Sequence, residues 1–275
     1  MKYIFMRFPA FKSKAVTLSY DDGVVYDKML IEIMDRNGLK GTFNINSGLF
    51  SEDGNRRLTK QQAIDLYSNS GHEVAMHGRK HLSLSEVPIA VANDDILNDR
   101  IALEEMFDTI ISGMAYANGS FDDQTISLLQ HCGVEYARTT ISTEKFDIPT
   151  DWLRLSATCH HNNPKLMELA RSFVEDKPHA YYWSRSPKLF YLWGHSYEFH
   201  DNNNWNVIEE FAKYIGNRED IWYATNIEIY KYVKAFESLQ FSANAKKVYN
   251  PSAIDVYINY FDKEILIKSG KIENL

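Results

Sequence analysis

The stretch Ala15-Val16-Thr17-Leu18-Ser19-Tyr20, followed at once by Asp21-Asp22-Gly23, decides the fold of this 275-residue chain. A short run rich in apolar and β-branched residues predicts a buried strand, and the polar turn residues after it end that strand. Apolar residues then recur at helical spacing from Val25 until Asn37-Gly38 stops them. We therefore expect a strand, a loop and a helix in this order, with two carboxylates where the strand ends.

The same order of strand, loop and helix returns along the chain. Strands are expected at residues 41–46, 73–76, 110–116, 136–141, 189–193 and 221–224, and helices at residues 59–70, 88–107, 121–132, 165–174, 205–215 and 227–236. Strands that alternate with helices predict βαβ units, and this count favours one α/β domain, a closed or nearly closed (β/α) barrel of about seven parallel strands. We expect the barrel at residues 1–240 and a C-terminal β extension packed on it at residues 241–275, formed by a short β-hairpin.

The composition excludes several classes of protein. Acidic residues outnumber basic ones, 37 to 30, for a formal net charge of −7, so nucleic acid is not an expected partner. Cys132 and Cys159 are too few for a disulfide scaffold and lack the CxxC spacing of a thiolate zinc site. The first residues do not look like a signal peptide, and charges interrupt every apolar run before the ~20 residues of a membrane helix. These features predict a cytoplasmic protein without a membrane partner and leave its oligomeric state open.

Polar side chains follow the expected strands where a barrel carries its active site. Asp21 and Asp22 follow the first strand, and His77 follows the third. Asn118 and His195 come after the fourth and sixth strands. Because the carboxyl ends of parallel strands meet at one face of a barrel, these residues are candidates for one site. One site drawn from early, middle and late units also favours one domain over two.

Three of the candidates have the chemistry of metal ligands. His77 and His81 are four positions apart, so on a helical turn both rings would share a face and could bind one cation. Asp22 could complete a three-ligand site with open positions, which is typical of a catalytic metal. The ordinary alternatives are two unrelated surface or capping histidines, and a turn and helix cap at Asp-Asp-Gly. Spacing alone leaves these alternatives open.

Taken together, two motifs resemble those of a known family. They read Tyr20-Asp21-Asp22-Gly23 and His77-Gly78-Arg79-Lys80-His81. The chain resembles the polysaccharide deacetylases of the NodB-homology type, carbohydrate esterase family 4, over roughly residues 15 to 233. The resemblance implies a distorted (β/α) barrel with fewer than eight strands. It also implies removal of N-linked or O-linked acetyl groups from an acetylated carbohydrate.

The resemblance assigns roles to individual residues. It makes Asp21 the general base and His195 the general acid. It makes Asp22, His77 and His81 the ligands of one divalent metal ion, for which zinc is the first expectation and cobalt, nickel and manganese are alternatives. The residues expected to contact substrate are Tyr116, Asn118, Trp152 and Trp193.

The third and fourth motifs of the family are less well matched. Asp151-Trp152 is similar to the fourth motif, which implies that Asp151 orients catalytic partners and that Trp152 lines the acetyl pocket. The third motif of the family contains an arginine, whereas this chain has Ala115-Tyr116-Ala117-Asn118-Gly119. We expect Arg154, from a different loop, to supply the missing guanidinium beside Asp21. The alternative reading of Arg154 is a solvated surface residue.

Two further stretches bear on the substrate. Residues 142–188 are expected to form loop around the barrel mouth, apart from the helix at 165–174. Within them, His160-His161 could contact sugar hydroxyls or the metal, or simply lie in a surface loop. Tyr181-Tyr182-Trp183 could stack on sugar rings. Two other functions stay open: a metal-dependent amidohydrolase or isomerase acting on a small sugar or amide, and a catalytically silent carbohydrate-binding barrel.

Overall fold

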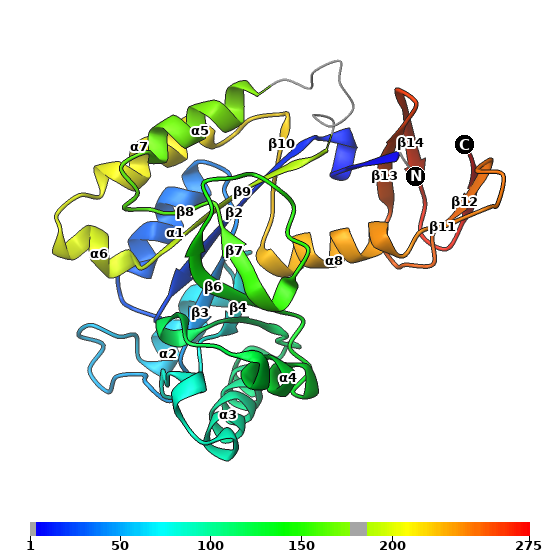
Figure 1. Cartoon of the computed structure of the whole chain (residues 1–275). Helices are drawn as coiled ribbons and strands as arrows, with labels where there is room; N and C mark the ends of the chain where they lie inside the picture. The colour runs from blue at the N-terminus through cyan, green and yellow to red at the C-terminus, as the bar shows by residue number, and fades with distance from the viewer. Residues whose placement is uncertain (1–3, 177–185) are drawn as a thin grey trace.

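The structure is a computed structural model that describes residues 4–176 and 186–275. Its main sheet is built around β2 (Lys14–Asp21), which pairs in parallel with β3 (Gly41–Ile45) on one side and with β9 (Lys188–Gly194) on the other. Beyond β3 the sheet continues, always in parallel, through β4 (Glu73–Met76), β5 (Gly113–Ala115), β6 (Tyr136–Ser142) and β7 (Leu155–Ala157). A short strand, β10 (Ile221–Tyr223), pairs with the start of β2. The predicted parallel sheet is thus confirmed (Figure 1).

The barrel is closed by two short consecutive strands, a bent run that the sequence analysis missed. Strand β7 pairs with β6, and β8 (Cys159–His160), which follows directly, pairs with β9 on the opposite side of the sheet. Thr158 lies between them, and its N–H donates to the Tyr191 carbonyl oxygen at 2.8 Å. The expectation of loop over residues 142–188 is therefore wrong at β7 and β8. Strand pieces of three and two residues are too short to show a period along the sequence.

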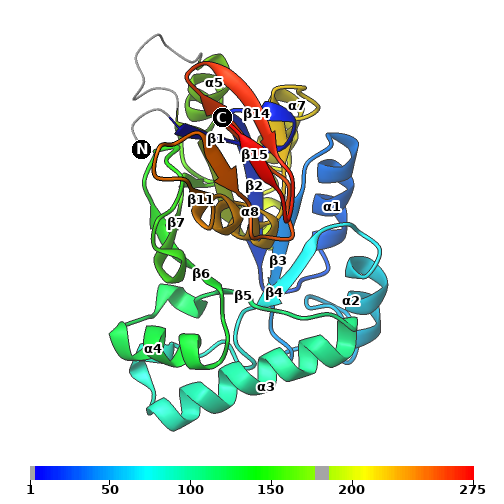
Figure 2. The same cartoon turned by 90° about the vertical axis from the view of Figure 1, so that its right-hand side faces the viewer.

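Helices surround the barrel on its outer face. Figure 1 shows α5, α6 and α7 side by side along one flank, and Figure 2 shows α3 and α4 together at the other end of the sheet. No helix within the described ranges is long and apolar enough to cross a bilayer. The helices are α1 (Asp27–Arg36), α2 (Lys60–Tyr67), α3 (Ile89–Phe107), α4 (Asp123–His131), α5 (Leu166–Glu175), α6 (Ser196–Asp201), α7 (Asn206–Ile215) and α8 (Asn226–Glu237).

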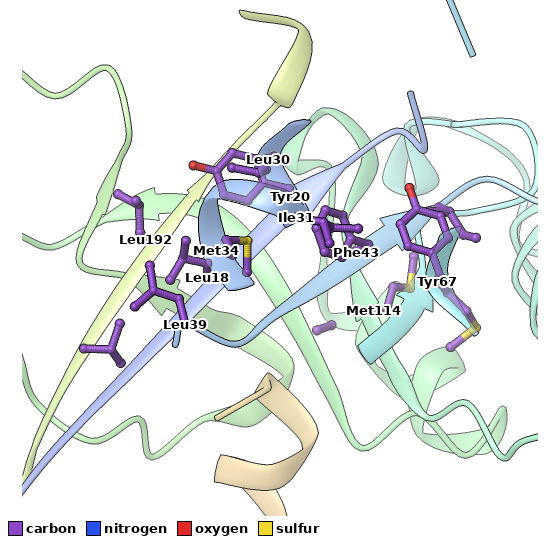
Figure 3. Close-up of a cluster of buried hydrophobic side chains, with 14 of the residues drawn as sticks. Leu18, Tyr20, Leu30, Ile31, Met34, Leu39, Phe43, Tyr67, Met114 and Leu192 are labelled. Carbon is purple, nitrogen blue, oxygen red and sulfur yellow. The ribbon is translucent and has the colours of Figure 1, made fainter. Parts of the chain in front are cut away.

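Side chains of the strands alternate between two environments. On β2, Leu18 and Tyr20 point into the large core between sheet and helices, together with Phe43 (Figure 3). Ala15, on the opposite face of β2, packs in a second core with Tyr191 and other residues of neighbouring strands. This alternation follows from the two-residue period of a strand. Asp21 lies six residues after Ala15 on β2, so its side chain points to the same face of the strand. The two-residue period of the strand therefore places the Asp21 carboxylate inside the barrel.

The C-terminal segment forms small antiparallel sheets beside the barrel. The expected hairpin is present as β13 (Val256–Tyr260) and β14 (Lys263–Ile267), and β1 (Ile4–Arg7) adds a third strand to it. The N-terminal strand therefore lies against the C-terminal segment (Figure 1). The remaining strands, β11 (Gln240–Phe241), β12 (Lys247–Tyr249) and β15 (Ile272–Asn274), make a second three-stranded sheet.

Candidate active site

Asp21 is the last residue of β2, and its side chain is buried in the barrel. The Asn44 side-chain amide of the neighbouring strand donates to Asp21 Oδ1 at 2.9 Å. The guanidinium of Arg138, from β6, pairs with Asp21 Oδ2. Both charged side chains are almost fully enclosed, with 0% of Arg138 and 3% of Asp21 exposed. A buried charge pair of this kind is stable only when each partner neutralises the other.

The surroundings of Asp21 hold it as a carboxylate. Burial by itself would raise the pKa of Asp21, but the Arg138 guanidinium, His77 and His195 act in the opposite direction and outweigh burial in sum. Together they lower the pKa to about 2. Asp21 is therefore ionised at neutral pH, as a general base must be before it accepts a proton.

The guanidinium beside Asp21 is not the one predicted from the sequence. Arg154 lies at the surface with 41% of its side chain exposed, and it pairs with Asp151 at 2.8 Å and with Asp123. Asp151 also accepts the backbone N–H groups of Leu153 and Arg154. The predicted role of Arg154 is therefore wrong, and Arg138 occupies that position. Asp151 caps a short turn, and among the described residues its contacts do not reach Asp21 or His195.

Asp22, His77 and His81 come together as a possible ligand set. One ligand atom from each lies within 4.8 Å of the other two, and His81 Nε2 is 3.7 Å from Asp22 Oδ1. The two histidines do not share a helical turn as expected. Gly78 and His81 have φ angles of 76° and 56°, so the chain between the histidines makes an irregular turn. Asp22 also adopts a positive φ of 86°, which costs energy that the surrounding structure has to offset.

Hydrogen bonds outside the ligand set prepare His77 to bind a cation. His77 Nδ1 lies 2.9 Å from the Ala115 carbonyl oxygen, which can only accept, so Nδ1 carries the proton and Nε2 keeps its lone pair. The loop of His77 is tied down by Asp99, whose Oδ2 accepts the His77 N–H at 3.2 Å, and by Asn46, whose amide donates to the His77 carbonyl oxygen at 2.8 Å. Two imidazoles and a carboxylate suit zinc and similar ions, so these residues fit a divalent metal.

A second arginine also reaches the ligand set. Arg57 Nη2 lies 3.2 Å from Asp22 Oδ1, and Arg57 Nη1 donates to the Asp22 carbonyl oxygen at 2.6 Å. These contacts help to hold Asp22 in its unusual backbone conformation. Arg57 comes from the loop between β3 and α2, a segment in which the sequence analysis singled out no residue.

His195 lies between two carboxylates. Its Nε2 is 3.8 Å from Asp21 Oδ2, and its Nδ1 is 3.4 Å from Glu198 Oε2. Burial by itself would lower the pKa of His195, but Glu198 and then Asp21 outweigh it and raise the pKa. A raised pKa favours the charged form of the ring, which can donate a proton, as the predicted general acid must.

Of the residues expected to contact substrate, the structure brings Trp193 to the site. The Arg138 guanidinium carbon lies 4.4 Å from the centre of the Trp193 ring. Tyr116 is buried and donates to the Leu153 carbonyl oxygen, and Asn118 is exposed and donates to Ser83. Trp152 packs edge-on against Tyr230 at 5.2 Å.

Contact of the other three residues with substrate stays a prediction. Among the described residues, the contacts of Tyr116, Asn118 and Trp152 do not include Asp21 or the ligand set. Tyr181-Tyr182-Trp183 lie outside the described residues.

The sequence analysis missed four residues of the site: Arg138, Asn44, Arg57 and Glu198. Arg138 did carry a signal, because a charged residue inside the expected strand at 136–141 needs a partner once it is buried. Glu198 and Arg57 lie in polar stretches where a carboxylate or a guanidinium is common. For these two residues the sequence offers no signal that separates a buried role from a solvated one.

Comparison with known proteins supports the resemblance seen in the motifs. Residues 9–137 match the family described as "Polysaccharide deacetylase". Over 100 residues the chain is 30% identical to a protein of Arthroderma benhamiae named a probable peptidoglycan-N-acetylglucosamine deacetylase. That match covers 36% of this chain and 21% of the relative, so the chain corresponds to only about a fifth of the relative's length.

Solved structures show the same fold at low sequence identity. A protein from Mycobacterium smegmatis assigned to the polysaccharide deacetylases has a TM-score of 0.59 at 18% identity, over 84% of this chain and 93% of its own. A family 4 carbohydrate esterase from Streptomyces lividans, solved with acetate, has a TM-score of 0.52 at 13% identity, over 77% of this chain and 92% of its own. Puue allantoinase has a TM-score of 0.59 at 12% identity, over 82% of this chain and 91% of its own.

The family match begins before β2 and ends within β6, so it includes the strand of Asp21 and the turn that carries His77 and His81. These are the elements on which the two best-matched motifs lie. This segment of the chain, residues 9–137, therefore matches the polysaccharide deacetylase family.

Proposed function

We propose that this protein is a divalent-metal-dependent deacetylase that removes N-acetyl or O-acetyl groups from a carbohydrate. The observation that carries the proposal is the position of Asp21. It is an ionised, buried carboxylate with His77 of the ligand set on one side, at 3.9 Å, and His195 on the other, at 3.8 Å. A base, an acid and a ligand set that converge on one point are what acyl hydrolysis requires.

Asp22, His77 and His81 would hold the metal ion. Asp21, with a pKa of about 2, is a weak base. It therefore needs water whose own pKa is lowered, and this is what a divalent ion supplies when bound, together with polarisation of the acyl carbonyl. The zinc-type donor set supports this assignment, while cobalt, nickel and manganese suit the same donors.

The remaining steps belong to side chains of the chain itself. Asp21 Oδ2 accepts the proton of the attacking water, while Arg138 and Asn44 keep the carboxylate in place. His195 Nε2 donates a proton to the leaving nitrogen or oxygen of the sugar. The two tasks need separate residues because one proton is removed and another is delivered at opposite sides of the scissile bond.

The substrate class follows from chemistry rather than from a bound ligand. A net charge of −7 disfavours a polyanionic substrate and favours a neutral acetylated sugar. A silent carbohydrate-binding barrel would need neither a base nor an acid. Hydrolysis of another small amide uses the same groups, so only the choice of substrates in an assay separates it from deacetylation.

The test is acetate release by the purified, zinc-loaded protein from a panel of N-acetylated and O-acetylated sugars, from monomers to polymers. We expect release from at least one member and none from the chelator-treated protein. Release of acyl groups only from amides that are not sugars would support the amidohydrolase alternative. A metal-loaded protein that releases acetate from no member of the panel would contradict the proposal.

A further inference from the structure

A second group of histidines lies behind His195. His160 and His161 on β8 and His195 itself surround one carboxylate, that of Glu198 on α6. Glu198 Oε2 lies 3.1 Å from His160 Nε2, 2.9 Å from His161 Nε2 and 3.4 Å from His195 Nδ1. Three imidazoles around a single buried oxygen resemble a metal site by residue type, so the position of the protons has to be established first.

The backbone around His160 argues against a metal ion in this group. The N–H of Asn162 donates to His160 Nδ1 at 3.1 Å, so Nδ1 holds a lone pair and the proton of a neutral ring sits on Nε2. Nε2, the protonated nitrogen, is the atom that lies 3.1 Å from Glu198 Oε2. His77 in the first ligand set has the opposite arrangement, because its Nδ1 donates to Ala115 and its Nε2 keeps the lone pair. His160 therefore turns its protonated nitrogen toward Glu198 Oε2, in a close polar contact of 3.1 Å.

His161 is held rigidly against the same carboxylate. Its side chain is 0% exposed, and its ring stacks on Tyr20 and packs against Phe199, with ring centres 5.8 Å and 4.1 Å away. A Cβ atom at Gly194 would collide with the His161 ring, so glycine at this position makes room for it. Burial lowers the pKa of His161 to about 4, which leaves the ring neutral at pH 7. The stacked rings and Gly194 thus fix the place of Glu198 Oε2 from the side opposite His195.

Glu198 in turn determines how His195 is oriented. The two lie three positions apart at the start of α6, with His195 at the N-cap. The two nitrogens of an imidazole point away from each other. With Nδ1 lying 3.4 Å from Glu198 Oε2, Nε2 is left facing Asp21 Oδ2, 3.8 Å away. The arrangement of carboxylate, imidazole and reaction centre follows the general logic by which a carboxylate sets the tautomer of a catalytic histidine.

We propose that Glu198, held by His160 and His161, is the positioning residue of His195: it keeps Nδ1 protonated and turns Nε2 toward the scissile bond. This inference rests on the proposed function, in which His195 is the general acid. It gives Glu198 the orienting role that the sequence motif had suggested for Asp151. It also gives a role to His160-His161, which the proposed reaction does not otherwise use.

Glu198→Gln keeps the shape of the side chain and removes its charge, and Glu198→Ala removes both. We expect kcat to fall by about 10²- to 10⁴-fold, the usual worth of a general acid, while KM and zinc content stay unchanged. The matched control is Glu210→Gln on α7, an exposed glutamate, which should leave kcat unchanged. His160→Ala should give a smaller loss than Glu198→Ala because His161 still holds the carboxylate.

The ¹⁵N spectrum of the histidine rings gives a readout that does not depend on turnover, with His195 assigned from the spectrum of His195→Gln. We expect a protonated Nδ1 at His195 in the wild type and an increased share of the Nε2–H tautomer in Glu198→Gln and Glu198→Ala. An unchanged ¹⁵N signature of His195 would overturn the inference, and so would an unchanged kcat. If the wild type releases no acetate at all, the proposed function fails, whereas the tautomer experiment still decides whether Glu198 positions His195.

Discussion

Two histidine and carboxylate groups flank Asp21, and they differ in the partners of their ring nitrogens. In the group of Asp22, His77 and His81, the Nδ1 of His77 donates to a backbone carbonyl oxygen, so the lone pair on Nε2 is free for a cation. In the group of Glu198, His160 and His161, the Nδ1 of His160 accepts from a backbone N–H, so Nε2 carries the proton. The first group is prepared for a metal, whereas in the second group a protonated nitrogen of His160 faces the carboxylate of Glu198.

The difference shows that residue type and proximity do not identify a metal site by themselves. Both groups contain two imidazoles and one carboxylate whose ligand atoms lie within 4.8 Å of one another. One backbone atom beside His77 and one beside His160 decide which nitrogen of that ring is available. The following experiments test this contrast, from the largest expected effect to the smallest.

Variants in the two groups should differ completely in zinc content. Asp22→Ala and His81→Ala should abolish zinc binding, because two ligands do not make a zinc site of this type. His160→Ala should retain the full zinc content of the wild type. Zinc content of the purified variants, measured by mass spectrometry, checks this. If His160→Ala also lowers the zinc content, the contrast between the groups is wrong.

Asp21 lies between the two groups and should be needed for turnover but not for metal. Asp21→Asn removes the base and keeps the size of the side chain, so we expect full zinc content and a loss of about 10²- to 10⁴-fold in kcat. Acetate release and zinc content, measured on the same preparation, check this. Full activity in Asp21→Asn would show that the base lies elsewhere, even if the reaction is a deacetylation.

Substitution of Arg138 and of Arg154 tests whether the buried ion pair stabilises the fold more than the surface ion pair. Arg138→Leu leaves Asp21 buried without its partner, so we expect a loss of about 3–5 kcal/mol in the free energy of unfolding. Arg154→Leu should cost much less, since its partners are exposed. Denaturant unfolding of both variants checks this. Equal losses would mean that the Arg138 pair contributes no more than a surface pair.

The buried pair of Asp21 and Arg138 also predicts how the stability of the fold depends on pH. The pKa of Asp21 is lowered to about 2 in the folded protein, below the ~3.9 of an unfolded chain. Asp21 therefore stabilises the fold at pH values above about 4, and this contribution is lost as the pH falls from about 4 to about 2. Comparison of wild type and Arg138→Leu over this range should show a steeper loss in the wild type. Parallel curves would contradict the low pKa of Asp21.

The smallest effect concerns a residue that holds the metal loop without binding the metal. Asn46 donates to the carbonyl oxygens of His77 and Gly78, at 2.8 Å and 2.6 Å. Asn46→Ala should weaken zinc binding by about 10- to 100-fold, the usual effect of removing an outer hydrogen bond from a ligand. The control is Asn98→Ala on α3, a half-buried residue whose amide donates to Asp94. Competition with a chelator measures both affinities, and equal affinities would show that the loop holds its shape without Asn46.

Much of the fold and the ligand set could be predicted because both depend on local signals. In strand β2 and in the helices after it, apolar residues recur at a clear spacing along the sequence. Asp22, His77 and His81 occur in short motifs at strand ends. The bent run of β7 and β8 could not be predicted, because its pieces are too short to show alternation. The substrate residues were chosen by analogy with motifs of the family, and among the described residues Tyr116, Asn118 and Trp152 contact Leu153, Ser83 and Tyr230, so their contact with substrate stays a prediction.

The sequence by itself determined that strands and helices alternate, that carboxylates and histidines follow the strands, and that the motifs resemble those of one family. The tertiary structure alone decided that Arg138, 117 residues from Asp21, is its partner, that Glu198 faces His195, and which nitrogen of each histidine is free. The physical reason is the range of the interactions. Periods and motifs arise from neighbours along the chain, whereas a buried charge or an imidazole is controlled by atoms that only folding brings within hydrogen-bond distance.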